Sequence, residues 1–336
     1  MAFERLPETV LVLYAELLDQ LRQAETSVAL PISGSFVSKS IRGHTYWYLQ
    51  KVAAGQKTQK YLGPESPELL QKIKAARENR AVVSIDTRRR RELVSMLIAG
   101  RASHEPAVFA AVLQVLSDSF VFRLGGVLVG THAFSCYGNM LGVRFEHQSL
   151  RTADIDVAQD STISVALSEE GAVDLLEKLK AIEPKFVAVP ELDARDPSTS
   201  FKVRGRDLRV DFVTPATGRR RTKPVPLPHL GVAAQPLDGL DYLIERTTKA
   251  AVVGGNGILA NVPLPARYAL HKMWVAGTRP ISEHSKSRKD VAQAEQLMAM
   301  LFSDHPNDIA DAVQAMKSRP KMWRRIEKDF DRISKA

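Results

Sequence analysis

Two carboxylates one residue apart, Asp154 and Asp156, stand in the stretch TADIDVA, in which every second residue is apolar. This alternation predicts a β-strand with both aspartates on one face and with Ile155 and Val157 on the other. Two carboxylates about 7 Å apart on one strand repel each other unless a cation lies between them. The pattern therefore predicts a cation site, provided that further acidic side chains complete it.

A third carboxylate, Asp211, lies in the alternating stretch DLRVDFVTP. Val210 and Phe212 belong to the apolar face of this strand, so Asp211 points to the opposite side. If the two strands are neighbours, all three aspartates converge. Three carboxylates suit Mg²⁺ or Mn²⁺, and two such ions can hold the attacking and leaving oxygens of an in-line phosphoryl displacement.

Gly130 and Thr131 end the apolar run FVFRLGGVLVG, residues 120–130, which reads as strand with a glycine break. A helix is expected from about Thr131. A strand that ends in glycine and opens into a helix exposes backbone N–H groups and the positive end of the helix dipole, and glycine lets a phosphate approach closely. The threonine hydroxyl adds a donor, so this junction predicts an anion site.

Taken in order, the Gly130-Thr131 junction, Asp154-x-Asp156 and the later Asp211 resemble the signature of the nucleotidyltransferase fold, the DNA polymerase β-like superfamily. Over about residues 120–300 the chain looks similar to a bacterial group called the GSU2403-type nucleotidyltransferase-like proteins. The stretches LHKMWVAGTR and KSRKDVAQAEQL resemble the Lys and Lys-Asp motifs of abortive-infection toxin nucleotidyltransferases. Two features depart from these patterns: the gap before Asp154 is long, and Gln293 stands where an acidic residue often follows the Lys-Asp pair.

The resemblance implies an α+β fold with a mixed-sheet palm. It also implies transfer of a nucleotidyl group from an NTP to a hydroxyl with two Mg²⁺ or Mn²⁺ ions, most readily on RNA and in a toxin-like or defence-like role. A protein hydroxyl as acceptor, or an inactive palm that only binds nucleic acid, remain open, as does an antitoxin-type partner protein. The resemblance implies that Asp154, Asp156 and Asp211 bind the metal ions, and that Asp211 also helps to deprotonate the acceptor. It implies that Gly130 and Thr131 bind phosphate. Lys272, with Arg288 or Lys289, would neutralise the triphosphate.

The elements before the palm have their own character. Residues 7–25 predict a helix, and SFVSKSI, HTYWYLQKV and KTQKYLG predict three short antiparallel strands. Residues 31–64 contain five Lys or Arg and no Asp or Glu. Such a sheet could bind nucleic acid, or its aromatic residues could simply pack on a helix. The basic residues concerned are Lys39, Arg42, Lys51, Lys57 and Lys60; the aromatic ones are Tyr46, Trp47, Tyr48 and Tyr61.

Three helices are expected next, in 66–80, 87–101 and 105–119, with four arginines, 88–91, opening the second as either a solvated face or a phosphate contact. Beyond residue 240 the chain reads as mostly helical, apart from a hairpin around GGNG. The expected division is an N-terminal helix (1–30), a basic sheet module (31–64), a helical connector (65–118), the palm (119–222) and a mostly helical C-terminal domain (223–336).

Composition limits the alternatives. The 336 residues carry a net charge of +9, which favours a polyanionic partner such as nucleic acid. A single cysteine, Cys136, excludes an intramolecular disulfide framework and any cysteine-rich zinc site. No apolar segment approaches the roughly 20 residues of a membrane span, and the N-terminus does not read as a signal peptide, so a cytoplasmic protein without a membrane partner is expected. His132, beside the anion site, could contact a nucleotide, but helix packing is the favoured interpretation.

Overall fold

The computed structural model describes residues 3–26, 35–41, 44–53, 56–146, 153–161, 174–191, 193, 196–216 and 223–335. The fold is α+β, as the sequence predicted. Strand β1 (Phe3–Arg5) pairs with β6 (Val143–Phe145), and helix α1 (Glu8–Thr26) follows β1. Within the described residues, no helix combines the length and apolarity that a membrane crossing requires.

Helix α2 (Pro67–Ala99) is a single helix of 33 residues, where the sequence suggested two. Its start is conventional, because the Ser66 hydroxyl accepts from the Leu69 N–H at 3.2 Å and Pro67 occupies the first turn. The segment 81–86 contains no glycine or proline, so nothing interrupts the helix there. The four arginines 88–91 therefore lie inside a helix and not at its start, contrary to expectation.

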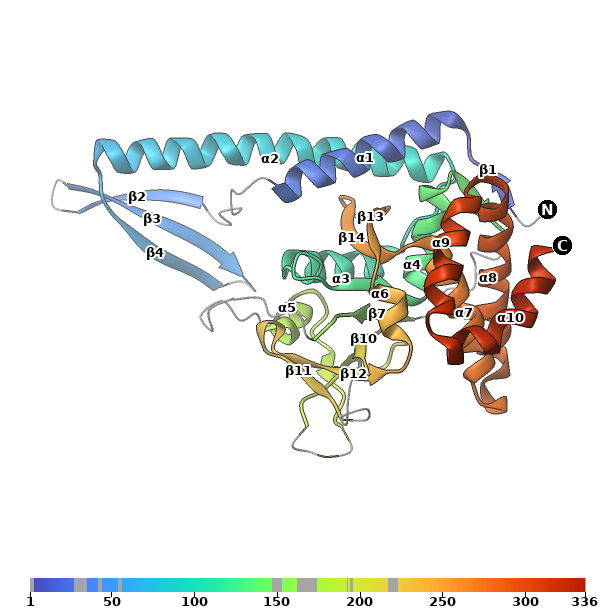
Figure 1. Ribbon diagram of the computed structural model, residues 1–336. Helices are drawn as coiled ribbons and strands as arrows, with labels where there is room; N and C mark the ends of the chain where they lie inside the picture. The colour runs from blue at the N-terminus through green and yellow to red at the C-terminus, as the bar shows by residue number, and fades with distance from the viewer. Residues whose placement is uncertain are drawn as a thin grey trace.

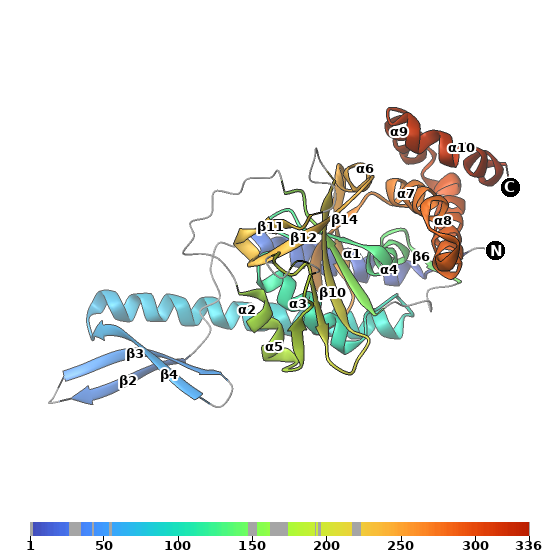
Figure 2. The ribbon, with the colours of Figure 1, turned by 90° about the horizontal axis from the view of Figure 1, so that it is seen from below.

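The three predicted N-terminal strands are confirmed as an antiparallel sheet in the order β2-β3-β4. This sheet lies at the far end of α2, away from the rest of the molecule, and both views show it there (Figures 1 and 2). Its bounds are β2 (Ser35–Ile41), β3 (His44–Ala53) and β4 (Gln56–Pro64).

The central sheet has seven strands of mixed direction, with the main order β11-β12-β10-β7-β5. Strands β7 and β10 are parallel neighbours, and β9 and β12 share the other side of β10, at its first and second halves. Only 127–129 of the predicted strand 120–130 is extended, because the chain turns through 120–126, where a Cβ on Gly126 would strike the Val121 carbonyl. The bounds are β5 (Val127–Val129), β7 (Asp154–Ala158), β8 (Phe186–Ala188), β9 (Ser200–Val203), β10 (Arg209–Pro215), β11 (Val225–Leu227) and β12 (Val232–Leu237).

Helices and a hairpin cover this sheet. The hairpin of β13 (Thr247–Val252) and β14 (Ile258–Pro263) turns at the GGNG stretch, as predicted. The remaining elements of the body are α3 (Ala107–Asp118), α4 (Gly130–Met140), α5 (Leu175–Ile182), α6 (Leu240–Ile244) and the 3₁₀ turn η2 (Pro228–Leu230). The C-terminal elements are α7 (Pro265–Thr278), η3 (Ile281–Glu283), α8 (His284–Asp304), α9 (Pro306–Lys317) and α10 (Pro320–Ser334), which confirm the helical reading of this part.

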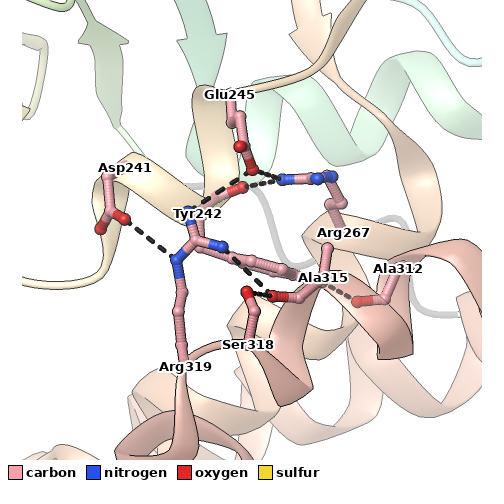
Figure 3. Close-up of polar contacts among 8 residues, drawn as sticks. All are labelled: Asp241, Tyr242, Glu245, Arg267, Ala312, Ala315, Ser318 and Arg319. Carbon is pink, nitrogen blue, oxygen red and sulfur yellow. Dashed lines mark hydrogen bonds and ion pairs between the residues drawn. The ribbon is translucent and has the colours of Figure 1, made fainter.

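An arginine cluster fastens the C-terminal helices to the short helix α6, which directly follows the sheet (Figure 3). Arg267 of α7 donates to the Tyr242 carbonyl at 2.8 Å and to Glu245 at 2.6 Å. Arg319, before α10, donates to Asp241 at 3.0 Å, and the Tyr242 hydroxyl donates to the Ala312 carbonyl of α9. The hydrogen bond from Arg267 is the main reason that the pKa of Glu245 is lowered. These contacts tie α7, α9 and α10 to the end of the palm.

Two apolar clusters hold the body together. The larger one joins the central sheet with the helices around it. The smaller one packs α1 on the C-terminal half of α2 and on the β13–β14 hairpin, through fully buried Leu17, Leu93 and Leu97 and through Ala251. Burying each leucine contributes about 2 kcal/mol relative to exposure. The N-terminal half of α2 extends beyond this cluster toward the β2–β4 sheet.

Candidate active site

The sheet register places two of the three predicted carboxylates side by side. Strands β7 and β10 run parallel, with Asp156 directly opposite Asp211. Adjacent strands are about 4.8 Å apart, so these two side chains project side by side from the same face of the sheet. Strand β5 lies on the other side of β7, with Val129 opposite Asp156, which brings the Gly130 junction to the same point. The expectation that the two aspartate strands are neighbours is confirmed.

Asp156 is the centre of this arrangement. It is partly buried, and no hydrogen bond reaches its carboxylate from the residues that the structure describes. Burial, followed by the charges of Asp211 and Asp154, raises the pKa of Asp156 to about 6, while the positive charge of Lys272 acts in the opposite direction. A carboxylate that is buried among like charges and lacks donors is one that a bound cation would stabilise.

Asp211 has partners that the sequence did not reveal. Arg209, two residues earlier on the same face, donates from Nε to Oδ1 of Asp211 at 2.6 Å, and the hydroxyl of Ser200 on β9 donates to the same oxygen. Arg209 also donates to the Ser200 hydroxyl at 2.8 Å. Strand alternation could have indicated Arg209, whereas Ser200 gave no signal because its place depends on the β9–β10 pairing.

Asp154 is the most exposed of the three aspartates. It is exposed at the start of β7, opposite Arg209 in the register. Accordingly, no group of three or more His, Cys, Asp or Glu side chains in the described part of the chain is arranged as a ready metal site. Asp156 and Asp211 form the facing pair, and Asp154 contributes to Asp156 through its charge.

The backbone at Gly130 lies directly against the Asp156 carboxylate. Gly130 begins α4 with φ +65°, a conformation that L-residues rarely adopt, and a Cβ at this position would collide with the Asp156 carboxylate. Its carbonyl accepts a hydrogen bond from the Tyr268 hydroxyl of α7 at 2.9 Å. Thr131, the predicted second residue of the anion site, is only 8% exposed. The helix predicted from about Thr131 is confirmed as α4, one residue earlier.

Lys272 of α7 lies close to this junction. Its ammonium is 5.4 Å from the centre of the Tyr268 ring, and it donates to Oδ1 of Asp290 at 2.6 Å. Arg279 donates to the other oxygen of Asp290 at 2.9 Å, so this buried aspartate, which belongs to the Lys-Asp motif but was assigned no role from sequence, binds two cations. Lys272 is 13% exposed and acts electrostatically on Asp156.

The other predicted cations sit on α8, where the Lys-Asp motif continues into Asp290. Burial lowers the pKa of Lys289, as does Lys272, while the charges of Asp290, Asp154 and Asp156 raise it. Lys289 is therefore within electrostatic reach of the carboxylates. Arg288 is exposed and lies about 100° around the helix from Lys289. Of the two cations proposed to accompany Lys272, the structure brings Lys289 to the cluster.

A cavity of about 300 Å³ opens beside Asp211, on the side away from Gly130. Its polar lining combines both charges, with Arg209 at one end and Glu191 beside Thr199. Glu191 is fixed in place, because its Oε1 accepts from the Thr199 N–H at 2.9 Å and from the Thr199 hydroxyl at 2.7 Å. The arrangement can therefore hold a polar group next to the Asp156–Asp211 pair.

Two further sequence candidates have structural roles. His132 is 3% exposed, its ring lies 5.1 Å from that of Phe109, and its Nδ1 lies 3.0 Å from Oε2 of Glu105, which confirms the favoured packing interpretation. Cys136 is buried, and burial raises the pKa of its thiol.

The arginine run on α2 mostly contacts the protein itself. Arg89 donates to Glu16 of α1 at 2.8 Å and Arg91 donates to Asn256 at 2.5 Å, while exposed Arg88 pairs with Glu92 of its own helix. These contacts bind α2 to α1 and to the β13–β14 turn. Among the residues proposed to bind nucleic acid, Lys39 is described, whereas Arg42 and the side chains of Lys51, Lys57 and Lys60 lie outside the described part of the structure.

The chain was compared with family models, curated proteins and solved structures, and matches were found among the family models. No curated protein and no solved structure matches the chain. A domain of unknown function (DUF6788) matches residues 13–72, which include most of α1, the β2–β4 sheet and the start of α2. A nucleotidyltransferase family matches residues 108–317, from α3 to the end of α9, which is more than half of the chain. The matched range contains the Gly130 junction, the Asp156–Asp211 pair and Lys272, and the chain belongs to this nucleotidyltransferase family.

Proposed function

We propose that this protein transfers a nucleotidyl group from an NTP to a hydroxyl, with Mg²⁺ or Mn²⁺ held by Asp156 and Asp211 and assisted by Asp154. The observation that carries the proposal is the register of three strands, which gathers the Asp156–Asp211 pair and the Gly130 junction at one edge. The raised pKa of Asp156 is consistent with a bound cation, because burial and then the charge of Asp211 disfavour the ionised carboxylate when no cation is present. When bound, two ions would neutralise charge on the reacting phosphate and its oxygens.

Each protein group has a part in the reaction. The triphosphate would lie at the N-terminus of α4, where Gly130 lets the backbone pass close to the Asp156 carboxylate, with Lys272 and Lys289 balancing its charge. The acceptor hydroxyl would enter from the cavity beside Asp211. Its oxygen attacks the α-phosphorus, the bond from that phosphorus to the bridging oxygen breaks, and pyrophosphate leaves. The proton of the hydroxyl passes to Oδ2 of Asp211, since Oδ1 already accepts from Ser200 and Arg209.

The acceptor that the chain favours is RNA, because the net charge of +9 attracts a polyanion. A toxin-like or defence-like role with an antitoxin-type partner belongs to the same proposal and rests on the sequence resemblance. A protein hydroxyl is the competing acceptor. An inactive palm is the competing state, and the Arg209–Asp211 ion pair at 2.6 Å is the observation that favours it, since Arg209 occupies the place of a metal on one oxygen.

The test is transfer of label from an α-labelled NTP to total RNA or to protein, in Mg²⁺ or Mn²⁺. We expect labelled RNA with the wild-type protein and none with Asp211→Asn. Asp207→Asn is the matched control, because Asp207 is exposed in the turn before β10 and should transfer normally. Label on protein would replace RNA as the acceptor. Absence of label under all conditions, from a protein that folds normally, would establish the inactive palm.

A further inference from the structure

The sheet β2–β3–β4 has two unlike faces. Trp47 lies on the face toward α2, where its indole N–H donates to Glu65 at 3.0 Å and the guanidinium of Arg77 lies 5.5 Å from its ring centre. Side chains alternate along a strand, so Tyr46 and Tyr48 of β3 lie on the opposite face. Trp47, grouped with the tyrosines on sequence alone, is thus part of the support of the sheet.

The opposite face carries a compact group that we call the tyrosine face. The rings of Tyr48 and Tyr61 lie 5.4 Å apart, and those of Tyr46 and Tyr61 lie 6.3 Å apart. Tyr61 is 53% exposed, although aromatic side chains of this size are usually buried. The ammonium of Lys39 lies 4.9 Å from the centre of the Tyr48 ring. The group consists of Lys39, Tyr46, Tyr48, Gln50, Gln59 and Tyr61.

Polar contacts hold this face in shape while leaving ring surface open. The Lys39 ammonium donates to the side-chain oxygen Oε1 of Gln59 at 2.6 Å, and the side-chain amide of Gln59 donates to Oε1 of Gln50 at 2.8 Å. The lysine is therefore fixed over the tyrosines rather than free in solvent. Residues 31–64 contain five Lys or Arg and no Asp or Glu, so the whole sheet is cationic.

We propose that the tyrosine face binds single-stranded nucleic acid, with bases stacked on Tyr48 and Tyr61 and a phosphate close to Lys39. The exposed ring of Tyr61, the half-buried rings of Tyr46 and Tyr48, two amides and a lysine match a strand whose bases are free to stack and whose backbone is anionic. A duplex keeps its bases in its interior and offers these rings no stacking partner. The proposal concerns binding alone, so it holds whether or not the palm transfers nucleotides.

The experiment measures fluorescence anisotropy of a labelled oligonucleotide with the full-length protein and no NTP. Single-stranded RNA, single-stranded DNA and a duplex of the same sequence are compared. We expect both single strands to bind more tightly than the duplex, and Tyr48→Ala or Tyr61→Ala to weaken binding by roughly five- to 150-fold. Tyr61→Phe, which keeps the ring, should bind as wild type does, whereas Tyr61→Leu, which keeps only the apolar bulk, should not.

The contribution of charge is tested with a matched pair of lysines. Lys39→Gln should reduce the slope of log affinity against log salt by about 0.7, as expected when one phosphate contact to a single strand is lost. Lys317→Gln is the control, because Lys317 also lies over an aromatic ring, that of Trp323 at 5.0 Å, but at the opposite end of the chain. Its salt dependence should equal that of the wild type.

Several outcomes would overturn the proposal. These are absence of binding by the wild-type protein, equal affinity for duplex and single strand, and wild-type affinity in the tyrosine variants. If the wild-type protein were a dimer and the Tyr61→Leu variant a monomer, the occupant of this face would be a second copy of the chain. Because this binding assay contains no NTP, a failure of transfer and a failure of binding remain distinct results.

Discussion

Replacing Asp156 by Asn should stabilise the protein in the absence of metal. The unfolded chain ionises this carboxyl near its ordinary pKa of 3.8, whereas burial and Asp211 raise the pKa to about 6 in the fold. Between these values the folded state binds the extra proton, so the free energy of unfolding falls as pH rises through about 4 to 6. The difference of about 2.2 units corresponds to up to about 3 kcal/mol lost above pH 7, because each unit is worth about 1.36 kcal/mol.

The assay is urea unfolding of wild type and Asp156→Asn in a chelator, at several pH values. The variant should be more stable by up to about 3 kcal/mol at pH 7.5, and the advantage should disappear near pH 4. Carboxyl groups remote from this pair are common to both proteins, so the difference reports the ionisation of Asp156 together with its coupling to Asp211 and Asp154. Asp207→Asn is the control; Asp207 is exposed and is not among the charges that shift the pKa of Asp156, so its replacement should leave the free energy of unfolding nearly unchanged.

Adding Mg²⁺ with NTP should reverse the order of the two proteins. A ligand that binds only the native state at 1,000 times its Kd stabilises by about 4.1 kcal/mol. This exceeds the wild-type deficit of up to about 3 kcal/mol, and only the wild type should gain it. The reasoning fails if Asp156→Asn is less stable than wild type in the chelator at pH 7.5. It fails equally if the extra stability of Asp156→Asn in the chelator is the same at every pH, since a packing effect and not the carboxylate charge would then be responsible.

Two further substitutions test the neighbours of this carboxylate. Gly130→Ala should destabilise the protein by about 1–3 kcal/mol, because φ is +65° and the new methyl group meets Asp156, and thermal unfolding would show this; an unchanged melting temperature would refute the argument. Lys272→Ala should raise the apparent NTP constant or lower turnover by roughly ten- to a thousandfold, the scale of about 1.4–4 kcal/mol for one electrostatic contact in a desolvated site. Lys272→Arg should recover part of that loss, and normal transfer kinetics in the alanine variant would leave Lys289 and Arg288 as the candidate cations.

The aspartate strands were readable from sequence because alternation is a local property. The pattern in TADIDVA assigns Asp156 to one face without knowledge of any neighbour, and the same holds for Asp211 in DLRVDFVTP. That the two strands are adjacent was an assumption, which the register confirmed. The partners of Asp211 show the limit, because Ser200 comes from a strand whose pairing with β10 no local pattern announces.

The cations show a second limit. Lys272 and Lys289 were found through motif resemblance, but Asp290 was not assigned a role, although it holds the ammonium of Lys272 at 2.6 Å. Its function depends on how α7 packs on α8, which is a tertiary property. The continuity of α2 was also missed: helices were expected in 66–80 and 87–101, although no glycine or proline between them enforces a break.

The unequal lengths of α1 and α2 have a consequence for how the sheet is aimed. Helix α1 has 19 residues and α2 has 33, so α2 is about 20 Å longer than its partner, at 1.5 Å per residue. We call the N-terminal part of α2 that extends beyond α1 the overhang, and the β2–β4 sheet lies beside it (Figure 1). Each residue inserted into or removed from the overhang would turn the sheet by about 100° about the helix axis, whereas seven residues would nearly restore its direction while moving it by about 10 Å. The length of the overhang of α2 thus determines the direction in which the tyrosine face points relative to the palm.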